Sequence, residues 1–159
     1  MNSKKISEEK RLKIVKDMNI LDTKPEERFD VLTRKATNTL GVPISTISII
    51  DKEREWFKSC QGIDLKEGPR EIAFCSEALK AEQIFIIEDT FKDENFKNNP
   101  YVTGEPFIRF YAGVVLRERK NGAPIGVFCV KDKKPRKMTA EEIATLIDLA
   151  NTAEEELNK

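Results

Sequence analysis

The sequence predicts an α+β domain in which an antiparallel sheet carries helices on one face and an irregular lid over the other. The segment order supports this, because strand-like segments fill the middle of the chain and helical segments lie at both ends. A long polar connection with several aromatic residues begins at Asp89 and leads into a strand, 108–116, whose two faces are both apolar. Connections of this length are often binding lids, so the architecture is suited to holding something small.

Two helices are expected at the start of the chain. The amino-terminal helical segment covers residues 1–21, with regular helix from Ser7 to about Leu21 and an apolar stripe containing Val15. Thr23 and Glu26 are spaced as a capping box for a second helix, which Gly41 ends. The buried face of that helix is expected to consist of Phe29, Leu32, Ala36 and Leu40.

The central segments are predicted from β-branched runs and turn residues. They are, in order, a strand at Ile44–Ile50, a strand at Arg54–Cys60, a loop at Gly62–Gly68, a short helix at Phe74–Ala81 and a strand at Ile84–Ile87. Asn121-Gly122 is typical of a type I′ turn and predicts a hairpin between the strand that contains Phe110 and a strand at Ala123–Val130.

The last helix has the clearest start. Thr139 and Glu142 are spaced as a capping box, and an apolar stripe continues to Leu157, so a helix is expected over residues 139–158. With 159 residues and neither repeats nor low-complexity segments, the chain is expected to form one domain over residues 1–159.

Composition excludes several classes of function. The 28 basic and 28 acidic residues balance, so a nucleic-acid partner is not expected, although Lys4 and Lys5 begin a basic run and Glu154–Glu156 form an acidic one. The absence of histidine excludes catalytic dyads that need it and histidine-ligated zinc or haem. Without a secretory signal or a long apolar run, we expect a cytoplasmic protein that does not enter the membrane. Its three separated cysteines suit reduced thiols.

The chain resembles a GAF domain, of the kind found before or within bacterial sensor kinases and diguanylate cyclases. The matching segments run in order along the chain: ILDTKPEERFD (20–30), DKEREWFKS (51–59), PREIAFCSEAL (69–79), EDTFKDENFKNNPYVTG (88–104), IRFYAGVVL (108–116), GAPIGVFCVKD (122–132) and PRKMTAEE (135–142). The resemblance implies a six-stranded antiparallel sheet with the first and last helices on one face. It also implies a lidded ligand pocket on the other face.

Ten residues are candidates for the ligand site on the lid side: Trp56, Arg70, Phe74, Cys75, Asp89, Phe96, Asn99, Phe107, Phe110 and Tyr111. The aromatic members either line a pocket or fill it as a small core. Arg70 could meet an anionic ligand or pair with Asp89 or Glu71, whereas Arg109 is expected to pair with a carboxylate of the helix that starts near Glu26.

Cys75 has two interpretations. At the start of a short helix its thiol would have a lowered pKa, whereas in the core it would be a small buried apolar residue. Cys129 lies in an apolar run and is expected in the core.

The predicted function is a non-catalytic regulatory or sensory module that binds a small molecule or a signalling protein and forms a homodimer through its terminal helices. The sequence does not identify a cofactor. Two alternatives remain open: a redox enzyme of the free methionine-R-sulfoxide reductase type that uses Cys75, and a purely structural dimerisation scaffold.

Overall fold

A six-stranded antiparallel sheet forms the centre of the computed structural model, which describes residues 6–159. The strand order is β3-β2-β1-β6-β5-β4. The strands are β1 (Ile44–Ile50), β2 (Arg54–Gln61), β3 (Glu67–Pro69), β4 (Ile84–Ile87), β5 (Phe110–Glu118) and β6 (Ala123–Asp132). The predicted fold class is confirmed. The basic run that begins at Lys4 and Lys5 lies partly outside the described residues.

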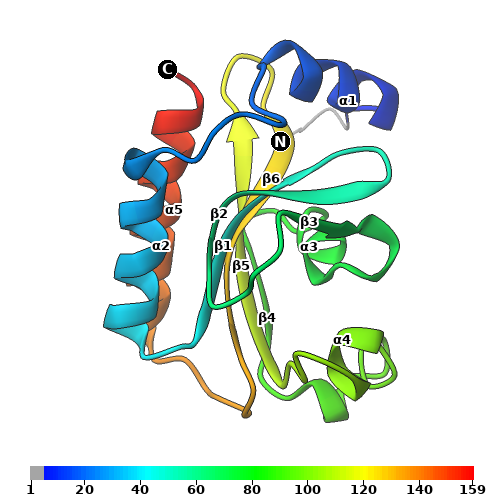
Figure 1. Ribbon diagram of the computed structural model, residues 1–159, viewed down its shortest axis with the longest axis vertical. Helices are drawn as coiled ribbons and strands as arrows, with labels where there is room; N and C mark the ends of the chain where they lie inside the picture. The colour runs from blue at the N-terminus through cyan, green and yellow to red at the C-terminus, as the bar shows by residue number, and fades with distance from the viewer. Residues whose placement is uncertain (1–5) are drawn as a thin grey trace.

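Helices α2 (Glu27–Leu40) and α5 (Ala140–Leu157) cover one face of the sheet, as Figure 1 shows. Helix α5 begins at the predicted capping box, in which the Glu142 amide donates to Thr139 Oγ1 (3.1 Å) and the Thr139 amide donates to Glu142 Oε1 (2.9 Å). Gly41 ends α2 in a left-handed conformation (φ 65°) that glycine adopts at little cost.

Helix α1 (Glu8–Asp17) contributes the buried Val15 to the same core as α2 and α5, with Ile14 and Met18 packed against that core. It crosses the end of the sheet near the β5–β6 hairpin (Figure 1), where the buried Arg11 donates to the Pro124 carbonyl (3.3 Å). Glu8 of the same helix pairs with Arg70 on the lid side (2.7 Å). The terminal helices α1 and α5 therefore cover different parts of the sheet.

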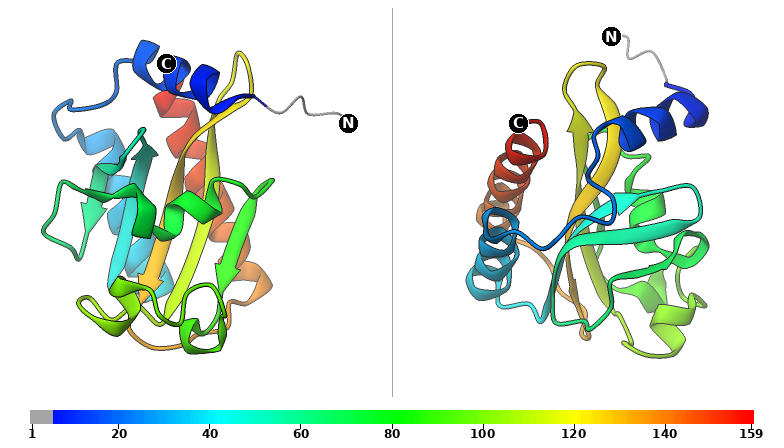
Figure 2. Two further views of the ribbon diagram at one scale, coloured as in Figure 1. Left: turned by 90° about the vertical axis from the view of Figure 1, so that its right-hand side faces the viewer. Right: turned by 45° about the horizontal axis from the view of Figure 1, so that its top comes forward.

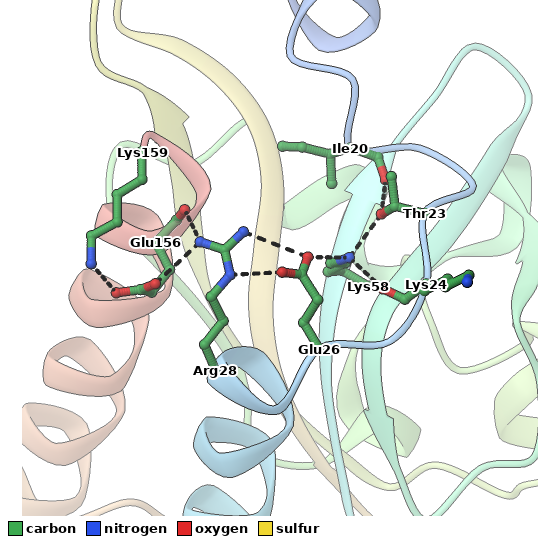
Figure 3. A network of polar contacts seen from close by, with 8 residues as sticks. All are labelled: Ile20, Thr23, Lys24, Glu26, Arg28, Lys58, Glu156 and Lys159. Carbon is green, nitrogen blue, oxygen red and sulfur yellow. Dashed lines mark hydrogen bonds and ion pairs between the residues drawn. The ribbon is translucent and has the colours of Figure 1, made fainter.

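The predicted capping box at the start of α2 is wrong. Thr23 Oγ1 donates to the Ile20 carbonyl (2.5 Å) and accepts from Lys58 Nζ (2.7 Å), while Glu26 pairs with Lys58 and Arg28 (Figure 3). The N-cap residue is Glu26, and its side chain makes no capping hydrogen bond. Pairing with the two cations takes the carboxylate away from the helix end.

Short helices cover the opposite face of the sheet, which we call the lid face (Figure 2, left). They are η1 (Arg70–Ile72), α3 (Phe74–Ala78), η2 (Thr90–Lys92) and α4 (Pro100–Thr103). Only α3 was predicted as an element; η2 and α4 lie inside the long connection, and β3 starts within the predicted loop 62–68. Among residues 6–159, no helix has the length and apolar character needed to cross a bilayer.

The β5–β6 hairpin is confirmed, but its turn is not of type I′. Residues 119–122 form a four-residue connection in which only Gly122 has a positive φ (73°). The Glu118 carboxylate accepts from the amides of Lys120 (3.1 Å) and Asn121 (2.9 Å), so a side chain stabilises a longer loop.

The two faces of β5 enter two separate cores. Phe110, Ala112, Val114 and Leu116 belong to the core under α2 and α5, whereas Tyr111 belongs to the core under the lid. Ile108, which precedes the strand, also packs in the lid-face core. Each core is closed by its own set of helices, which gives the lid face an interior separate from the helix face.

Candidate functional site

An aromatic cluster occupies the centre of the lid face. The rings of Phe74 and Phe96 lie 4.6 Å apart between centroids, and Phe74 lies 5.3 Å from Tyr111. Phe85 completes the group, 6.1 Å from Tyr111 and 6.2 Å from Phe96. Because Phe74, Phe96 and Tyr111 are almost fully buried, these aromatic side chains fill much of the space under the lid.

A chain of polar groups runs beneath this cluster. The Cys75 Sγ lies 3.0 Å from Tyr111 Oη and 3.8 Å from Ser48 Oγ. Ser48 Oγ lies 2.8 Å from Thr46 Oγ1, which in turn lies 3.0 Å from Cys129 Sγ. All five side chains are buried, so hydroxyl and thiol groups give the lid-face interior a polar character.

The two buried thiols differ in acidity. Burial, together with the neighbouring Cys129, raises the pKa of Cys75, which contradicts the expectation that a helix start would lower it. Burial also opposes ionisation of Cys129, but the neighbouring Cys75 thiol and the charge of Lys131 lower its pKa to about 7. The more acidic thiol is therefore on β6, at a position expected to be plain core. Cys60 donates to the Ile63 carbonyl (3.3 Å), and burial raises its pKa to about 11.

Two buried charged residues on the lid face were missed in the sequence. Glu55 of β2 is 2% exposed and Lys131 of β6 is 5% exposed. Burial opposes the charge of Lys131, but Cys129 and Glu55 together raise its pKa, so Lys131 is an ammonium ion. Strand periodicity held a signal for Lys131, because it follows Cys129 by two residues and thus shares its face.

The remaining polar candidates lie at the rim. Arg70 donates to Glu8 (2.7 Å) and to the Asp51 carbonyl (2.9 Å), at a groove of about 470 Å³. Neither Asp89 nor Glu71 is its partner. Asn99 Oδ1 accepts from the Tyr101 amide (2.8 Å) at the start of α4, and Asn99 Nδ2 donates to the Ile72 carbonyl (3.0 Å). Asn99 thus joins α4 to η1 and holds the lid together.

Asp89 is the partner of Arg109, which corrects the expectation that Arg109 pairs with the helix near Glu26. Arg109 Nη2 lies 3.0 Å from Asp89 Oδ1, and the guanidinium lies 3.5 Å from the centroid of the Phe91 ring. The Arg109 hydrogen bond and charge lower the pKa of Asp89. Asp89 also lines an open groove of about 730 Å³ with Lys92, Arg136 and other residues.

Three aromatic candidates lie apart from this cluster. Trp56 and Phe110 belong to the core under α2 and α5, on the opposite side of the sheet, which corrects their assignment to the pocket. Phe107 is 47% exposed. The lid face thus brings together Phe74, Cys75, Phe96 and Tyr111 from the candidate list. Among residues 6–159, no three side chains of the metal-binding types gather as a metal site requires.

Comparison with known proteins identifies the family. Residues 24–157 match the family model described as GAF domain. The chain belongs to the GAF domain family. GAF domains of this kind are regulatory modules of signalling proteins that bind small ligands or partners, in line with the predicted role.

The chain is 36% identical, over 141 residues, to a cyclic di-GMP phosphodiesterase of Pseudomonas aeruginosa. The match covers 89% of this chain but 24% of that relative, so the GAF domain spans about a quarter of the relative's length.

Solved structures share the fold. A GAF domain of an Acinetobacter phosphoenolpyruvate-protein phosphotransferase has a TM-score of 0.66 at 18% identity, covering 96% of this chain and 94% of that chain. A type II free methionine-R-sulfoxide reductase of Thermoplasma acidophilum has a TM-score of 0.66 at 15% identity. The match covers 82% of this chain and 89% of that chain. At such identities the likeness concerns the fold alone.

Proposed function

We propose that this GAF domain is a non-catalytic sensory module that binds a small molecule beneath the lid of α3 and α4. The observation that supports this most is the buried polar interior of the lid face, where Glu55, Lys131 and two thiols lie under aromatic side chains. Apolar walls with a few placed polar groups are typical of small-molecule sites. The proposed site keeps seven of the candidates from the sequence. They are Phe74, Cys75, Phe96, Asn99 and Tyr111, with Arg70 and Asp89 at the rim.

A ligand-induced change would reach a partner protein through the helices. We propose that the domain forms a homodimer that includes α5, and that ligand binding changes its packing. In the Pseudomonas relative, which is named as a cyclic di-GMP phosphodiesterase, the matching segment is a small part of a longer protein. By analogy, this domain would regulate an enzymatic or signalling partner rather than carry out chemistry itself.

A reductase role has weaker support. A cysteine reductase needs an accessible thiolate as its nucleophile, whereas Cys75 is fully buried and burial raises its pKa. An assay of thiol-dependent reduction of free methionine sulfoxide tests this directly. We expect no turnover; turnover that Cys75→Ser abolishes would overturn the non-catalytic proposal.

Native mass spectrometry of gently purified protein, compared with the denatured mass, is the test of the proposal. An additional small mass on a dimer would support a ligand-binding sensor. A bare dimer that binds no small molecule would instead favour the dimerisation scaffold. A bare monomer would overturn the proposed route through the helices.

A further inference from the structure

The two buried thiols of the lid face lie over the same row of the sheet. Cys129 of β6 has Thr46 of β1 opposite it on one side and Gly113 of β5 opposite it on the other. Directly opposed residues in antiparallel strands point to the same side of the sheet, so these three residues form a row across the lid face. The Cys129 sulfur lies within this row, 3.0 Å from Thr46 Oγ1.

Cys75 reaches this row from the lid. Its Sγ lies 3.8 Å from Ser48 Oγ of β1 and 3.0 Å from Tyr111 Oη. The Tyr111 hydroxyl lies over Gly113 of β5, since a Cβ added at Gly113 would be 2.5 Å from it. Strand β6 lies between β1 and β5, so the Cys75 sulfur contacts groups on both sides of β6, and its helix α3 packs directly on that strand. Cys75 and Cys129 are therefore neighbours, one on the lid and one on the sheet.

Lys131 makes the two thiols chemically unequal. It follows Cys129 by two residues on β6, so the two side chains start on the same side of the sheet. Its Nζ lies 5.9 Å from the centroid of the Tyr111 ring, whose hydroxyl contacts Cys75. The Lys131 charge favours the thiolate of Cys129 by lowering its pKa, whereas burial raises the pKa of Cys75 and keeps it protonated. A thiolate beside a thiol is the arrangement from which a disulfide forms on oxidation.

Cys60 does not belong to this pair. It lies on β2, opposite Thr46 on the side away from Cys129. Two strand spacings, about 10 Å, therefore separate its Cα from that of Cys129, whereas a disulfide spans at most about 7 Å between Cα atoms. Burial also raises the pKa of Cys60 to about 11. Cys60 is half-buried and thus more accessible than the other two thiols, so it serves as an internal control.

We propose that Cys129 and Cys75 form a redox pair, which a peroxide converts into a disulfide that joins β6 to α3. Because both thiols are buried, the oxidant must be small and uncharged, as hydrogen peroxide is. This inference goes beyond the proposed function and does not depend on a ligand beneath the lid.

The oxidation takes place in two steps. The Cys129 thiolate attacks one oxygen of hydrogen peroxide, the O–O bond breaks, and the hydroxide that leaves takes up a proton to become water. Cys129 is then a sulfenic acid. The Cys75 sulfur attacks the Cys129 sulfur, the S–O bond breaks, and the hydroxide that leaves takes the Cys75 proton to become a second water. The two sulfurs together lose two electrons, which reduce the peroxide.

The disulfide would fasten the lid to the sheet. Helix α3 is part of the lid, and β6 is one of the two central strands. A covalent bond between them replaces the side-chain contacts that Cys75 makes with Tyr111 and Ser48. Hydrogen exchange in residues 74–78 should therefore be several-fold slower in the oxidised chain than in the reduced chain. Equal exchange in the two forms would show that the bond does not hold the lid.

The test is to treat the reduced, purified chain with a slight excess of hydrogen peroxide, remove the peroxide with catalase, unfold the chain and label its free thiols with iodoacetamide. The reduced chain has three thiols to label, and the oxidised chain should keep one, on Cys60. Peptide mapping without reductant should find Cys75 joined to Cys129, and dithiothreitol should restore all three thiols. Three labelled thiols after peroxide, or a disulfide that includes Cys60, would overturn the inference.

Cysteine variants assign the steps. Cys75→Ser should stop the reaction at the Cys129 sulfenic acid, which dimedone traps, and Cys129→Ser should leave both remaining thiols free. Cys60→Ser is the matched control and should form the disulfide at the rate of the wild type. Disulfide formation that survives the change at Cys75 or at Cys129 would overturn the pairing.

Lys131→Met tests which thiol attacks the peroxide. It should slow disulfide formation at pH 7 several-fold, because less Cys129 is ionised. Lys133→Met, an exposed change two residues away, should leave the rate unaltered. An unchanged rate in Lys131→Met would overturn the assignment of Cys129 as the attacking thiol.

Native mass spectrometry of the reduced chain separates this inference from the proposed function. A bound molecule in a chain that forms no disulfide with peroxide would overturn the redox pair and leave the sensor proposal standing. A disulfide in a chain that binds no small molecule would support the redox pair and count against the sensor proposal.

Discussion

The carboxylate of Glu26 lies 2.7 Å from the buried ammonium group of Lys58 and thereby joins the start of α2 to β2 (Figure 3). Lys58 Nζ also donates to Thr23 Oγ1 and to the Lys24 carbonyl, both at 2.7 Å. Lys58 is the additional residue of a β-bulge, because Ile47 lies opposite Ser59 while Ser48 lies opposite Phe57. The bulge lets Lys58 and Ser59 both point toward α2, where Ser59 Oγ donates to Asp30 (2.6 Å).

Lys58→Met should therefore destabilise the domain by about 1–3 kcal/mol, because it removes three contacts to residues 23–26 and leaves their acceptors without a buried donor. Urea unfolding measures the change. Lys24→Met is the matched control, since only the backbone of Lys24 takes part and its side chain is exposed. If Glu26→Gln is as costly in the Lys58→Met background as in the wild type, the two residues are not coupled and the interpretation fails.

The Arg109 side chain holds η2 against the start of β5. It pairs with Asp89 and stacks on Phe91, while Thr90 Oγ1 donates to the Ile108 carbonyl (2.9 Å). Arg109→Met should loosen this end of the lid, so hydrogen exchange in residues 90–97 should quicken several-fold while exchange in β1 and β6 is unchanged. Lys92→Met, an exposed change in the same segment, serves as the control. Unchanged exchange in Arg109→Met would show that the pair does not hold the lid.

Strands, helices and the two-faced character of β5 could be predicted because each depends on local periodicity. The partners of the polar and charged side chains could not be predicted in this way. Arg109 pairs with Asp89 rather than with α2, because Asp89 and Arg109 lie at adjoining ends of the paired strands β4 and β5. The bulge at Lys58 has no local signal, and β3 is too short and too poor in β-branched residues to be distinguished from a loop.

The candidate site was predicted only in part for a similar reason. Phe74, Cys75 and Tyr111, all placed on the lid side from the sequence, contact one another there. Trp56 was assigned to the lid face but packs under α2 and α5. The sequence does not reveal which of the adjacent aromatic residues Trp56 and Phe57 faces the helices. Lys131 was missed because β6 extends to Asp132, beyond the apolar run that marked the predicted strand.

The Cys129 thiol should titrate near neutral pH. Its pKa is about 7 in the folded chain against 9.0 for an ordinary thiol, whereas that of Cys75 is raised. Thiolate absorbance near 240 nm should therefore rise around pH 7 in the folded protein, and Cys129→Ser should remove this step. A Lys131→Met variant should move the step to higher pH, because the positive charge of Lys131 favours the thiolate.

The free energy of unfolding should change with pH because Cys129 ionises. When folding lowers the pKa of a group, the ionised group stabilises the folded state at pH values above the pKa of the unfolded chain. This stabilisation is lost as the pH falls through the pKa of the folded chain. The stability difference between wild type and Cys129→Ser should thus be greater at pH 9 than at pH 7, by up to about 2 kcal/mol. A difference that does not change over this range would mean that Cys129 is not ionised in the folded chain.

The Tyr111 hydroxyl occupies space that is available only because residue 113 is glycine. A Cβ at Gly113 would lie 2.5 Å from Tyr111 Oη and 2.7 Å from Val127 Cγ1, both closer than atoms can pack. Gly113→Ala should therefore push the Tyr111 ring away from Cys75 and destabilise the domain by about 1–3 kcal/mol. Tyr111→Phe removes the nearer clash, so the double variant should be less destabilised than the sum of the single changes, as a double-mutant cycle by urea unfolding would measure. Strict additivity would show that the hydroxyl does not lie over Gly113, because residues in contact are expected to be coupled.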